Sequence, residues 1–529
     1  MTSALPENAD LFFERKQAKA LLKACRAGDA AALTRMQAHL CSRQGSDASQ
    51  PTLADAQFVI ARERGFPSWA KLKSHIEARQ PIEQQAERFL RAAWNGEQAI
   101  ATRLLARNPA VAKHSIYTAC AALDADAVAN WLTRDSAFPA PPPEQPGFSP
   151  LMYVCASRMH ALAPSFADAS LRCARLLLDH GADSNSYMVG GVGGSRLPAL
   201  YYACVGNNVP LVRLLLERGA DPNDGESTYH AAELNHRECL KLLLAHGAQI
   251  NERHPHWNNT VLFFLATHAT HAEGMQWVLE HGANPNVTSG DAGEVPLHRA
   301  AARGHTAMVA LLLAHGADPN FARIDGRTSY AFAVRSGNVA VMEKLRAAGA
   351  AQVGVTWQDE LLGACVRGDE PTARSIATTN SRLIETLAAE DRSFFTDAAG
   401  KGDVDAVRAM ASVGFDLSWE HTEGGTALHW AAWWGRPEVV KLLVRLGAPI
   451  NFRDSTYGSS PIAWSAHGST NCRRADESYC TIVDALIDAG AQYEAAINRW
   501  NEPLQRMASR GVRARLVARG FAPSEGSTA

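Results

Sequence analysis

Apolar residues recur at helical spacing in many short segments of the chain. In Met308-Val309-Ala310-Leu311-Leu312-Leu313, for example, the larger apolar side chains fall on one face of a helix. The segment ends just before Gly316, and glycine adopts the left-handed conformation of a helix terminus at little cost. A shorter alanine-rich segment precedes it, and Gly304-His305 marks a turn between the two. The pattern predicts pairs of helices joined by tight turns.

The glycine that ends each pair recurs along the chain with a nearly constant separation. Successive separations are 38, 28, 35, 34, 33, 65, 33 and 43 residues, for Gly181, Gly219, Gly247, Gly282, Gly316, Gly349, Gly414, Gly447 and Gly490. The value of 65 is close to two periods and predicts a degenerate unit around 361–365. A single pair of helices cannot bury its apolar stripe alone, so the units are expected to stack.

Several units open with nearly the same residues. Pro296-Leu297-His298-Arg299-Ala300-Ala301 and Thr426-Ala427-Leu428-His429-Trp430-Ala431-Ala432 follow a T-P-L-H-x-A-A pattern, while 260–266 and 328–333 depart from it. This opening and a period near 33 resemble the ankyrin-repeat family. The segment 53–72 looks like a leader found in some bacterial members. The resemblance implies an all-α ankyrin-repeat solenoid of stacked helix-turn-helix units, with helical caps at both ends.

The regularity of the pattern divides the chain into four expected regions. Residues 1–82 are expected to form an N-terminal helical cap with a divergent repeat, and 83–147 divergent helical repeats. Residues 148–492 are expected to form the ankyrin-repeat array, and 493–529 a C-terminal helical cap with a disordered tail. Irregular stretches at 136–149, rich in proline, and 184–196, rich in glycine, interrupt the array. They are expected to be surface insertions or a flap beside the array.

Composition narrows the range of partners. The net charge of −2 provides no strong field to attract nucleic acid or an anionic membrane. No apolar stretch approaches the roughly 20 residues of a membrane span, and the first residues lack a signal-peptide pattern. The ten cysteines show no paired C-x-x-C spacing, which favours reduced core thiols in the cytoplasm. The expected chain is a cytoplasmic monomer whose partner is a protein, with no nucleic acid and no membrane.

Catalytic and metal-binding motifs do not stand out. The sequence lacks a P-loop, a G-x-S-x-G and an H-E-x-x-H motif. Most histidines have positions given by the repeat, such as the last turn of a second helix, where a donor meets unpaired carbonyls. His254 and His256 have no evident third ligand, so we expect no metal and no cofactor. The resemblance implies that His298 and His429 make hydrogen bonds that brace neighbouring loops.

Large aromatic residues occupy the x position of the opening in several units. The resemblance places first helices on the concave side of the array, so these residues are expected to form a stripe there. In the late repeats the expected cluster includes neighbouring tryptophans and nearby hairpin residues, and the predicted partner-binding set is Trp430, Trp433, Trp434, Trp464, His467, Arg453 and Tyr457. Tryptophan, tyrosine and arginine carry much of the binding energy of protein interfaces. Filling of gaps between tilted helices would account for Trp430 and Trp464 equally well.

Three functions are compatible with these observations. The first is a non-catalytic protein-binding module that holds a partner on its concave face and hairpin tips. The second is an enzyme or small-molecule binder with a pocket in the late repeats, where His421, His467, Asp454, Tyr457 and Arg453 would supply polar groups. The third is a passive scaffold without a defined partner site. The missing catalytic motifs favour the first.

Overall fold

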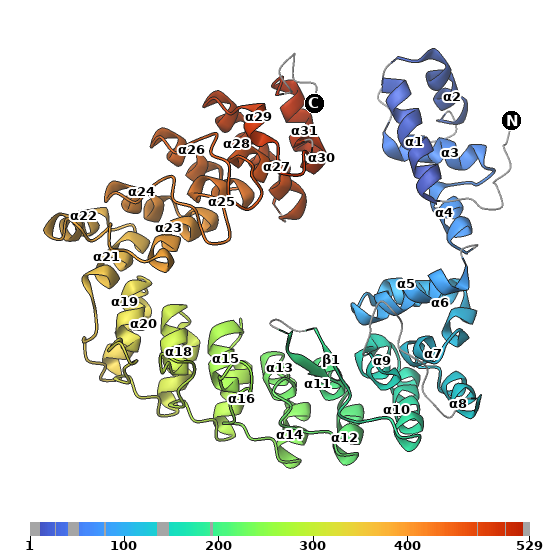
Figure 1. The fold of residues 1–529 in the computed structure, drawn as a ribbon, viewed down its shortest axis with the longest axis horizontal. Coiled ribbons are helices and arrows are strands. Elements are labelled where there is room, and N and C mark those ends of the chain that lie inside the picture. The colour runs from blue at the N-terminus through green and yellow to red at the C-terminus, as the bar shows by residue number, and fades with distance from the viewer. Residues whose placement is uncertain are drawn as a thin grey trace. The chain divides into compact units, whose positions relative to one another are not determined.

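Helices joined by short turns make up nearly all of the structure (Figure 1). The computed structural model describes residues 11–26, 28–40, 52–78, 81–134, 148–190, 194–472, 474–502 and 504–521. The chain divides into two compact units, residues 1–249 and 250–529, and the boundary lies inside the predicted array. The fold is therefore all-α, as predicted, while the four expected regions stay a prediction. In the described part of the chain, no helix is long and apolar enough to cross a membrane.

The first unit begins with four helices that share a core of their own. They are α1 (Leu11–Arg26), α2 (Ala30–Leu40), α3 (Leu53–Glu63) and α4 (Trp69–Ala78). Helix α3 begins at a capping box in which Thr52 and Asp55 bond each other's backbone N–H groups. Phe66 and Trp69 pack against the buried core of these helices.

Five further pairs of helices follow in the first unit. Their elements are α5 (Ile82–Trp94), α6 (Gln98–Arg107), the 3-10 helix η1 (Pro109–Lys113), α7 (Ile116–Ala122), α8 (Ala125–Arg134), α9 (Pro150–Ala156), the 3-10 helix η2 (Arg158–Ala161), α10 (Pro164–Asp179), α11 (Ala199–Val205), α12 (Val209–Glu217), α13 (Ser227–Glu233) and α14 (Arg237–Ala245). The glycine-rich stretch forms a hairpin, because β1 (Tyr187–Val189) pairs antiparallel with β2 (Arg196–Pro198). The proline-rich stretch lies mostly outside the described residues.

The second unit continues the same repeat. It contains α15 (Val261–His268), α16 (Glu273–Glu280), α17 (Pro296–Ala302), α18 (Thr306–Ala314), α19 (Ser329–Arg335), α20 (Val339–Ala347), α21 (Trp357–Val366), α22 (Glu370–Thr379), α23 (Ala389–Lys401), α24 (Val404–Ser412), α25 (Ala427–Trp433), α26 (Pro437–Arg445), α27 (Pro461–Asn471), α28 (Asp476–Asp488), α29 (Tyr493–Ala496), α30 (Leu504–Met507) and α31 (Arg510–Ala518). Helices α21 to α24 fill the interval of 65 residues with two pairs, so the predicted degenerate unit is confirmed.

The ends of the second helices follow the predicted chemistry. All nine terminal glycines have positive φ, between +84° and +100°, which side chains other than glycine rarely adopt. The last-turn histidines bond the carbonyl oxygen four residues earlier through Nδ1, at 2.8 to 2.9 Å; they are His180, His246, His281 and His315. Their predicted structural role at the unpaired carbonyls is confirmed.

A ladder of asparagine side chains joins successive repeats. Asn320, for example, donates from Nδ2 to the carbonyl of Gly349 and accepts the N–H of Ala351 through Oδ1. The same pair of bonds is made by Asn185, Asn223, Asn251, Asn286 and Asn451 to the next terminal glycine and the residue two positions after it. Because an amide both donates and accepts, one side chain satisfies two backbone groups of its neighbour.

Buried charged side chains connect the successive repeats from α19 to α23. Arg335, on α19, pairs with Asp359 of α21 at 3.2 Å and with Asp391 of α23. All three side chains are largely buried, and burial lowers the pKa of Arg335. Each carboxylate also accepts the backbone N–H that begins its own helix, from Thr356 or Ala388. The arginine therefore balances two helix-capping carboxylates at once.

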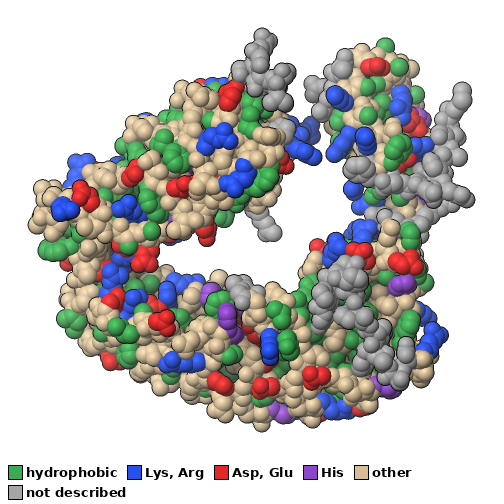
Figure 2. Space-filling view, viewed as in Figure 1, with side chains coloured by type: hydrophobic (Ala, Val, Ile, Leu, Met, Phe, Trp, Pro, Cys, Tyr) green, Lys and Arg blue, Asp and Glu red, His purple; other side chains and the backbone are tan. Residues whose placement is uncertain are grey.

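The C-terminal helices close the second unit. Val512 and Leu516 of α31 are buried against the core formed by the late repeats. Two arginines of this C-terminal segment form ion pairs with α28. Arg515 bonds Asp484 at 2.6 Å, and Arg519 bonds the same carboxylate at 3.0 Å. Elsewhere, acidic and basic side chains are interspersed over the visible surface (Figure 2), in keeping with the small net charge.

The cysteines of the described residues are free thiols, including Cys472 and Cys480. Seven of these nine are buried, in positions where small side chains pack between helices. Burial raises the pKa of Cys365 to about 12. Such thiols stay protonated near neutral pH and are poor nucleophiles.

Candidate functional site

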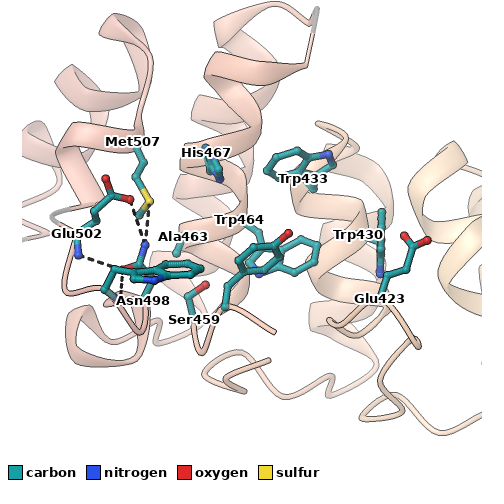
Figure 3. Close-up of a pocket in the computed structure, with 12 residues that line it drawn as sticks. Glu423, Trp430, Trp433, Ser459, Ala463, Trp464, His467, Asn498, Glu502 and Met507 are labelled. Carbon is teal, nitrogen blue, oxygen red and sulfur yellow. Dashed lines mark hydrogen bonds between the residues drawn. The ribbon is translucent and has the colours of Figure 1, made fainter. Parts of the chain in front are cut away.

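An aromatic pocket of about 620 Å³ lies within the second unit (Figure 3). It is formed by α25, α27, the hairpins that precede these two helices, and the segment that leads from α29 through α30. The lining residues are Glu423, Trp430, Trp433, Tyr457, Ser459, Ala463, Trp464, His467, Asn498, Trp500, Glu502 and Met507. The repeat and the cap thus contribute different walls.

Helical spacing accounts for the first wall. Trp430 and Trp433 are three residues apart on α25, and Trp464 and His467 are three residues apart on α27. Residues at this spacing lie on one face of a helix. Because the two helices are first helices of successive units, the repeat brings these four side chains together. The ring centroids of Trp430 and Trp464 are 5.5 Å apart, and those of Trp433 and His467 are 5.2 Å apart.

Trp464 is the centre of the aromatic cluster. Its ring makes edge-to-face contacts with Trp430, Trp433 and Tyr457, with centroid separations of 5.5 to 6.0 Å. This arrangement is favoured because the positive edge of one ring meets the negative face of another. Trp464 is only 6% exposed, whereas Trp500, which also lines the pocket, is 62% exposed. The pocket therefore has a packed floor and an accessible rim.

Asp454 holds the floor in place. Its carboxylate accepts the indole N–H of Trp464 at 3.0 Å and the backbone N–H groups of Tyr457 and Ser459. Burial opposes ionisation of Asp454, but these hydrogen bonds together outweigh it and lower the pKa of the carboxyl. The carboxylate of Asp454 therefore fixes the conformation of the hairpin and the position of the Trp464 ring. Its acceptor sites are engaged inside the chain, which makes it a poor candidate for acid or base work.

His429, beside this floor, joins two repeats. Its Nδ1 accepts the backbone N–H of Thr426 at 3.1 Å, and its Nε2 lies 3.1 Å from the carbonyl oxygen of Ser459 in the next hairpin. His298 makes the equivalent bonds to Val295 and Phe321. The expected bracing of neighbouring loops by these two histidines is confirmed.

We expect the second unit to lose stability as the pH falls from about 6.5 to about 4. Burial is the main cause that lowers the pKa of His429 to about 4, while an unfolded histidine has a pKa of about 6.5. Below pH 6.5 the unfolded chain binds the proton more readily, so stability present above that pH is lost on acidification. The difference corresponds to about 3 kcal/mol. Urea unfolding at pH 7 and pH 4.5 measures it.

His429→Gln is the informative variant for this pH dependence, since glutamine retains both a donor and an acceptor but does not titrate. Its loss of stability between pH 7 and pH 4.5 should be smaller than that of the wild type. His315→Gln, at an exposed helix end, serves as the control and should keep the wild-type pH dependence. Equal pH dependence in the wild type and in His429→Gln would contradict the assignment.

Five of the seven predicted site residues line the pocket; they are Trp430, Trp433, Tyr457, Trp464 and His467. Trp434 does not, because one further residue on a helix turns the side chain by about 100°. It lies instead on the side of Gly400 in α23, where a Cβ would come within 3.0 Å of its ring. Arg453 also lies outside, since its guanidinium donates to the carbonyls of Gly458 and Ile497 at 2.7 and 2.8 Å.

Of the polar set proposed for an enzyme, only His467 and Tyr457 line the pocket. His421 and Arg453 are absent from its lining, and Asp454 is engaged with the hairpin. In the described part of the chain, no group of three or more histidine, cysteine or acidic side chains is placed to hold a metal. Nδ1 of His254 accepts the N–H groups of His256 and Trp257 within their own turn.

Sequence reasoning missed the wall that the C-terminal cap contributes. Asn498 is buried and organises it, because Oδ1 accepts the N–H groups of Trp500 and Glu502 at 3.1 and 3.0 Å. Nδ2 of Asn498 lies 3.4 Å from the carboxylate of Glu502. This turn presents Trp500 and Glu502 to the pocket. The sequence signal was a tryptophan among polar residues, in Asn498-Arg499-Trp500-Asn501-Glu502.

Comparisons with known proteins agree with this architecture. A model of three ankyrin repeats matches residues 160–254, 200–289, 262–356, 361–454 and 395–497, together more than half of the chain. The chain is 30% identical over 155 residues to the ankyrin repeat protein YahD of Escherichia coli, covering 27% of this chain and 74% of that protein. It is 38% identical over 100 residues to the NF-kappa-B p105 subunit of Mus musculus, covering 18% of this chain and 10% of that protein.

A solved structure to which the chain is similar is the ankyrin repeat domain of Bcl-3, at 24% identity and a TM-score of 0.32. That match covers 37% of this chain and 86% of the Bcl-3 chain. The chain spans only 10 to 35% of the length of the first curated relatives it matches. The relatives come from bacteria and from eukaryotes, so the bacterial subgroup stays a prediction. The chain belongs to the family of ankyrin-repeat proteins.

Proposed function

We propose that the chain binds a protein partner through the first helices and hairpin tips of its repeats, with the aromatic pocket as the anchor point. Ankyrin repeats generally mediate interactions between proteins, and this supports the class of function. The observation that carries the proposal is the convergence of four tryptophans and a tyrosine on one cavity. Interfaces concentrate their binding energy in such residues when a partner removes them from water.

The exposure of the rim supports this reading over simple gap filling. Trp464 is already buried by its own chain, so it adds little area to an interface. Trp500 and Tyr457 are 62% and 42% exposed, and their ring centroids are 6.1 Å apart. A partner that covers them would gain roughly 25 cal/mol for each Å² of apolar surface buried. A floor that is fixed before binding lowers the ordering cost.

A small-molecule ligand is the second candidate. The volume of about 620 Å³ lies within the roughly 300–1,000 Å³ range of ligand pockets. A mostly apolar lining with a few polar groups is also typical of such sites. The cytoplasmic location, the monomeric state and the lack of affinity for nucleic acid expected from the sequence stay predictions. A passive scaffold would need none of the pocket residues for its interactions.

Affinity capture from the source cells, followed by binding of the purified partner, tests the proposal. Trp433→Ala and Trp500→Ala should each weaken the complex by about 2–4 kcal/mol, the range of interface hot spots. Trp434→Ala is the matched control, because it removes a 42% exposed tryptophan that lies outside the pocket. Recovery of the same proteins by all three variants in wild-type amounts would reject the pocket as the anchor.

Native mass spectrometry of the purified chain separates the second candidate from the first. A small-molecule ligand would appear as a bound mass that is lost in Trp500→Ala, whether or not a protein is present. A protein partner with no bound small molecule supports the first candidate.

A further inference from the structure

The charge of the pocket lining has one sign. Glu423 and Glu502 contribute carboxylates, and among the described residues that line the pocket there is no lysine or arginine. In Figure 3 the two glutamates lie at opposite ends of the row of aromatic rings. Glu423 is exposed and Glu502 is half-buried, so both remain accessible to a ligand. A ligand that enters this pocket meets aromatic surface in the middle and negative charge at both ends.

The indole N–H groups of the floor are used within the chain. Trp430 donates to the carbonyl of Gly424 at 3.0 Å, and Trp464 donates to Asp454 at 3.0 Å. The indole N–H of each of these two rings is therefore already bonded to an acceptor within the chain. The surface left for a ligand is carbon and π electrons, and the negative face of an indole attracts cations more strongly than other aromatic rings do.

The chain's own nearby cations do not fill the pocket. The guanidinium of Arg453 is bonded to the carbonyls of Gly458 and Ile497, and that of Arg499 is bonded to the carbonyl of Ser455. Arg499 nevertheless places its guanidinium 5.8 Å from the ring centroid of Trp500. One rim tryptophan thus already accepts a guanidinium from outside the cavity.

We infer that the pocket receives an arginine side chain from an exposed segment of the partner protein. This inference rests on the proposed function and specifies its chemistry. The planar guanidinium stacks on the tryptophan rings, and its five N–H donors reach toward Glu423 or Glu502. The cavity of about 620 Å³ exceeds one side chain, so residues flanking the arginine enter with it.

Other occupants fit the lining less well. A lysine ammonium is strongly hydrated and stacks poorly on a flat ring. A quaternary ammonium suits the tryptophans but has no donor for the two carboxylates. A neutral apolar side chain would remove the carboxylate of Glu502 from water without compensating its charge. This desolvation costs free energy. Of these occupants, only arginine can both stack on the flat aromatic rings and donate hydrogen bonds to a carboxylate at either end of the pocket.

Titration of the full chain with N-acetyl-arginine methylamide, followed by NMR of the indole N–H signals, tests the inference. The signals of Trp433 and Trp500 should shift, and that of Trp434 should not. The citrulline analogue, which has nearly the same shape without the charge, should bind at least about fivefold more weakly. Glu423→Gln combined with Glu502→Gln should weaken arginine binding by about fivefold, since the guanidinium loses its charge pair whichever of the two carboxylates it reaches. Glutamate and glutamine are similar in size, so the fold should be retained.

Three outcomes would overturn the inference. They are equal binding of the arginine and citrulline compounds, tighter binding of tetramethylammonium than of the arginine compound, and unchanged arginine binding in the double glutamine variant. The affinity-capture experiment distinguishes a failure of the arginine assignment from a failure of the proposed protein-binding function. If Trp500→Ala loses the partner while the double glutamine variant keeps it at full affinity, the arginine assignment fails and the protein-binding function stands.

Discussion

Replacing Arg335 with alanine is expected to lower the free energy of unfolding of the second unit by about 3–5 kcal/mol, the cost of leaving buried charges without a partner. Asp359 is fully buried and Asp391 is nearly so, and both lose their buried partner in this variant. The guanidinium of Arg335 also lies 5.3 Å from the ring centroid of Phe394. Urea unfolding followed by circular dichroism, with hydrogen exchange over α19 to α23, measures the effect.

Arg327→Ala provides the matched control for this prediction. Arg327 lies 3.8 Å from the same carboxylate of Asp359, but a quarter of its side chain is exposed. Its removal should cost no more than about 1 kcal/mol, as for pairs near the surface. Similar losses of unfolding free energy in both variants would show that burial of the Arg335 ion pairs does not increase their contribution to stability. Wild-type stability of Arg335→Ala would show that the two carboxylates are balanced in another way.

Replacing Trp464 with alanine is expected to cost about 3–5 kcal/mol of stability, as for other large aromatic residues removed from a core. The variant removes a ring that is only 6% exposed and that packs against Trp430 and Trp433 of α25, and it deprives Asp454 of a hydrogen bond. Trp464→Phe should cost less, because it keeps most of the ring and loses only the indole N–H. Thermal and urea unfolding give the ranking of the two variants.

The rim of the pocket gives the opposite expectation for stability. Trp500→Ala should change the free energy of unfolding by less than about 1 kcal/mol, because the residue is mostly exposed. If Trp464→Ala were as stable as Trp500→Ala, the distinction between floor and rim would be wrong. If Trp500→Ala unfolded the C-terminal helices, its loss of binding would no longer report on the pocket.

The sequence predicted those parts of the molecule that repeat. Terminal glycines located the second helices, and the interval between Gly349 and Gly414 revealed the degenerate unit. The same periodicity brought Trp430, Trp433, Trp464 and His467 together, because equivalent positions of adjacent units become neighbours in space. For these four residues, the repeat period alone was nearly sufficient to predict that their side chains are in contact.

Contacts outside the period could not be anticipated in this way. Trp500 reaches the pocket through an irregular turn held by Asn498, and no repeat position corresponds to it. Arg335 meets Asp359 and Asp391 only because α21 and α23 begin with capping carboxylates at that point. Trp434 lies outside the pocket for a different reason, since adjacency in the sequence is not adjacency on a helical face.

The asparagine ladder has a consequence for how such an array can change by gene duplication. A repeat that carries the ladder asparagine offers the same two bonds to whatever similar repeat follows, so copies can be added or removed without altering what their neighbours meet. The α19 to α23 stretch lacks this interchangeability. A duplicate of α21 alone would bring another buried Asp359 without a second Arg335 to neutralise it, so growth or shortening of the array is expected at the ladder repeats and not in this stretch.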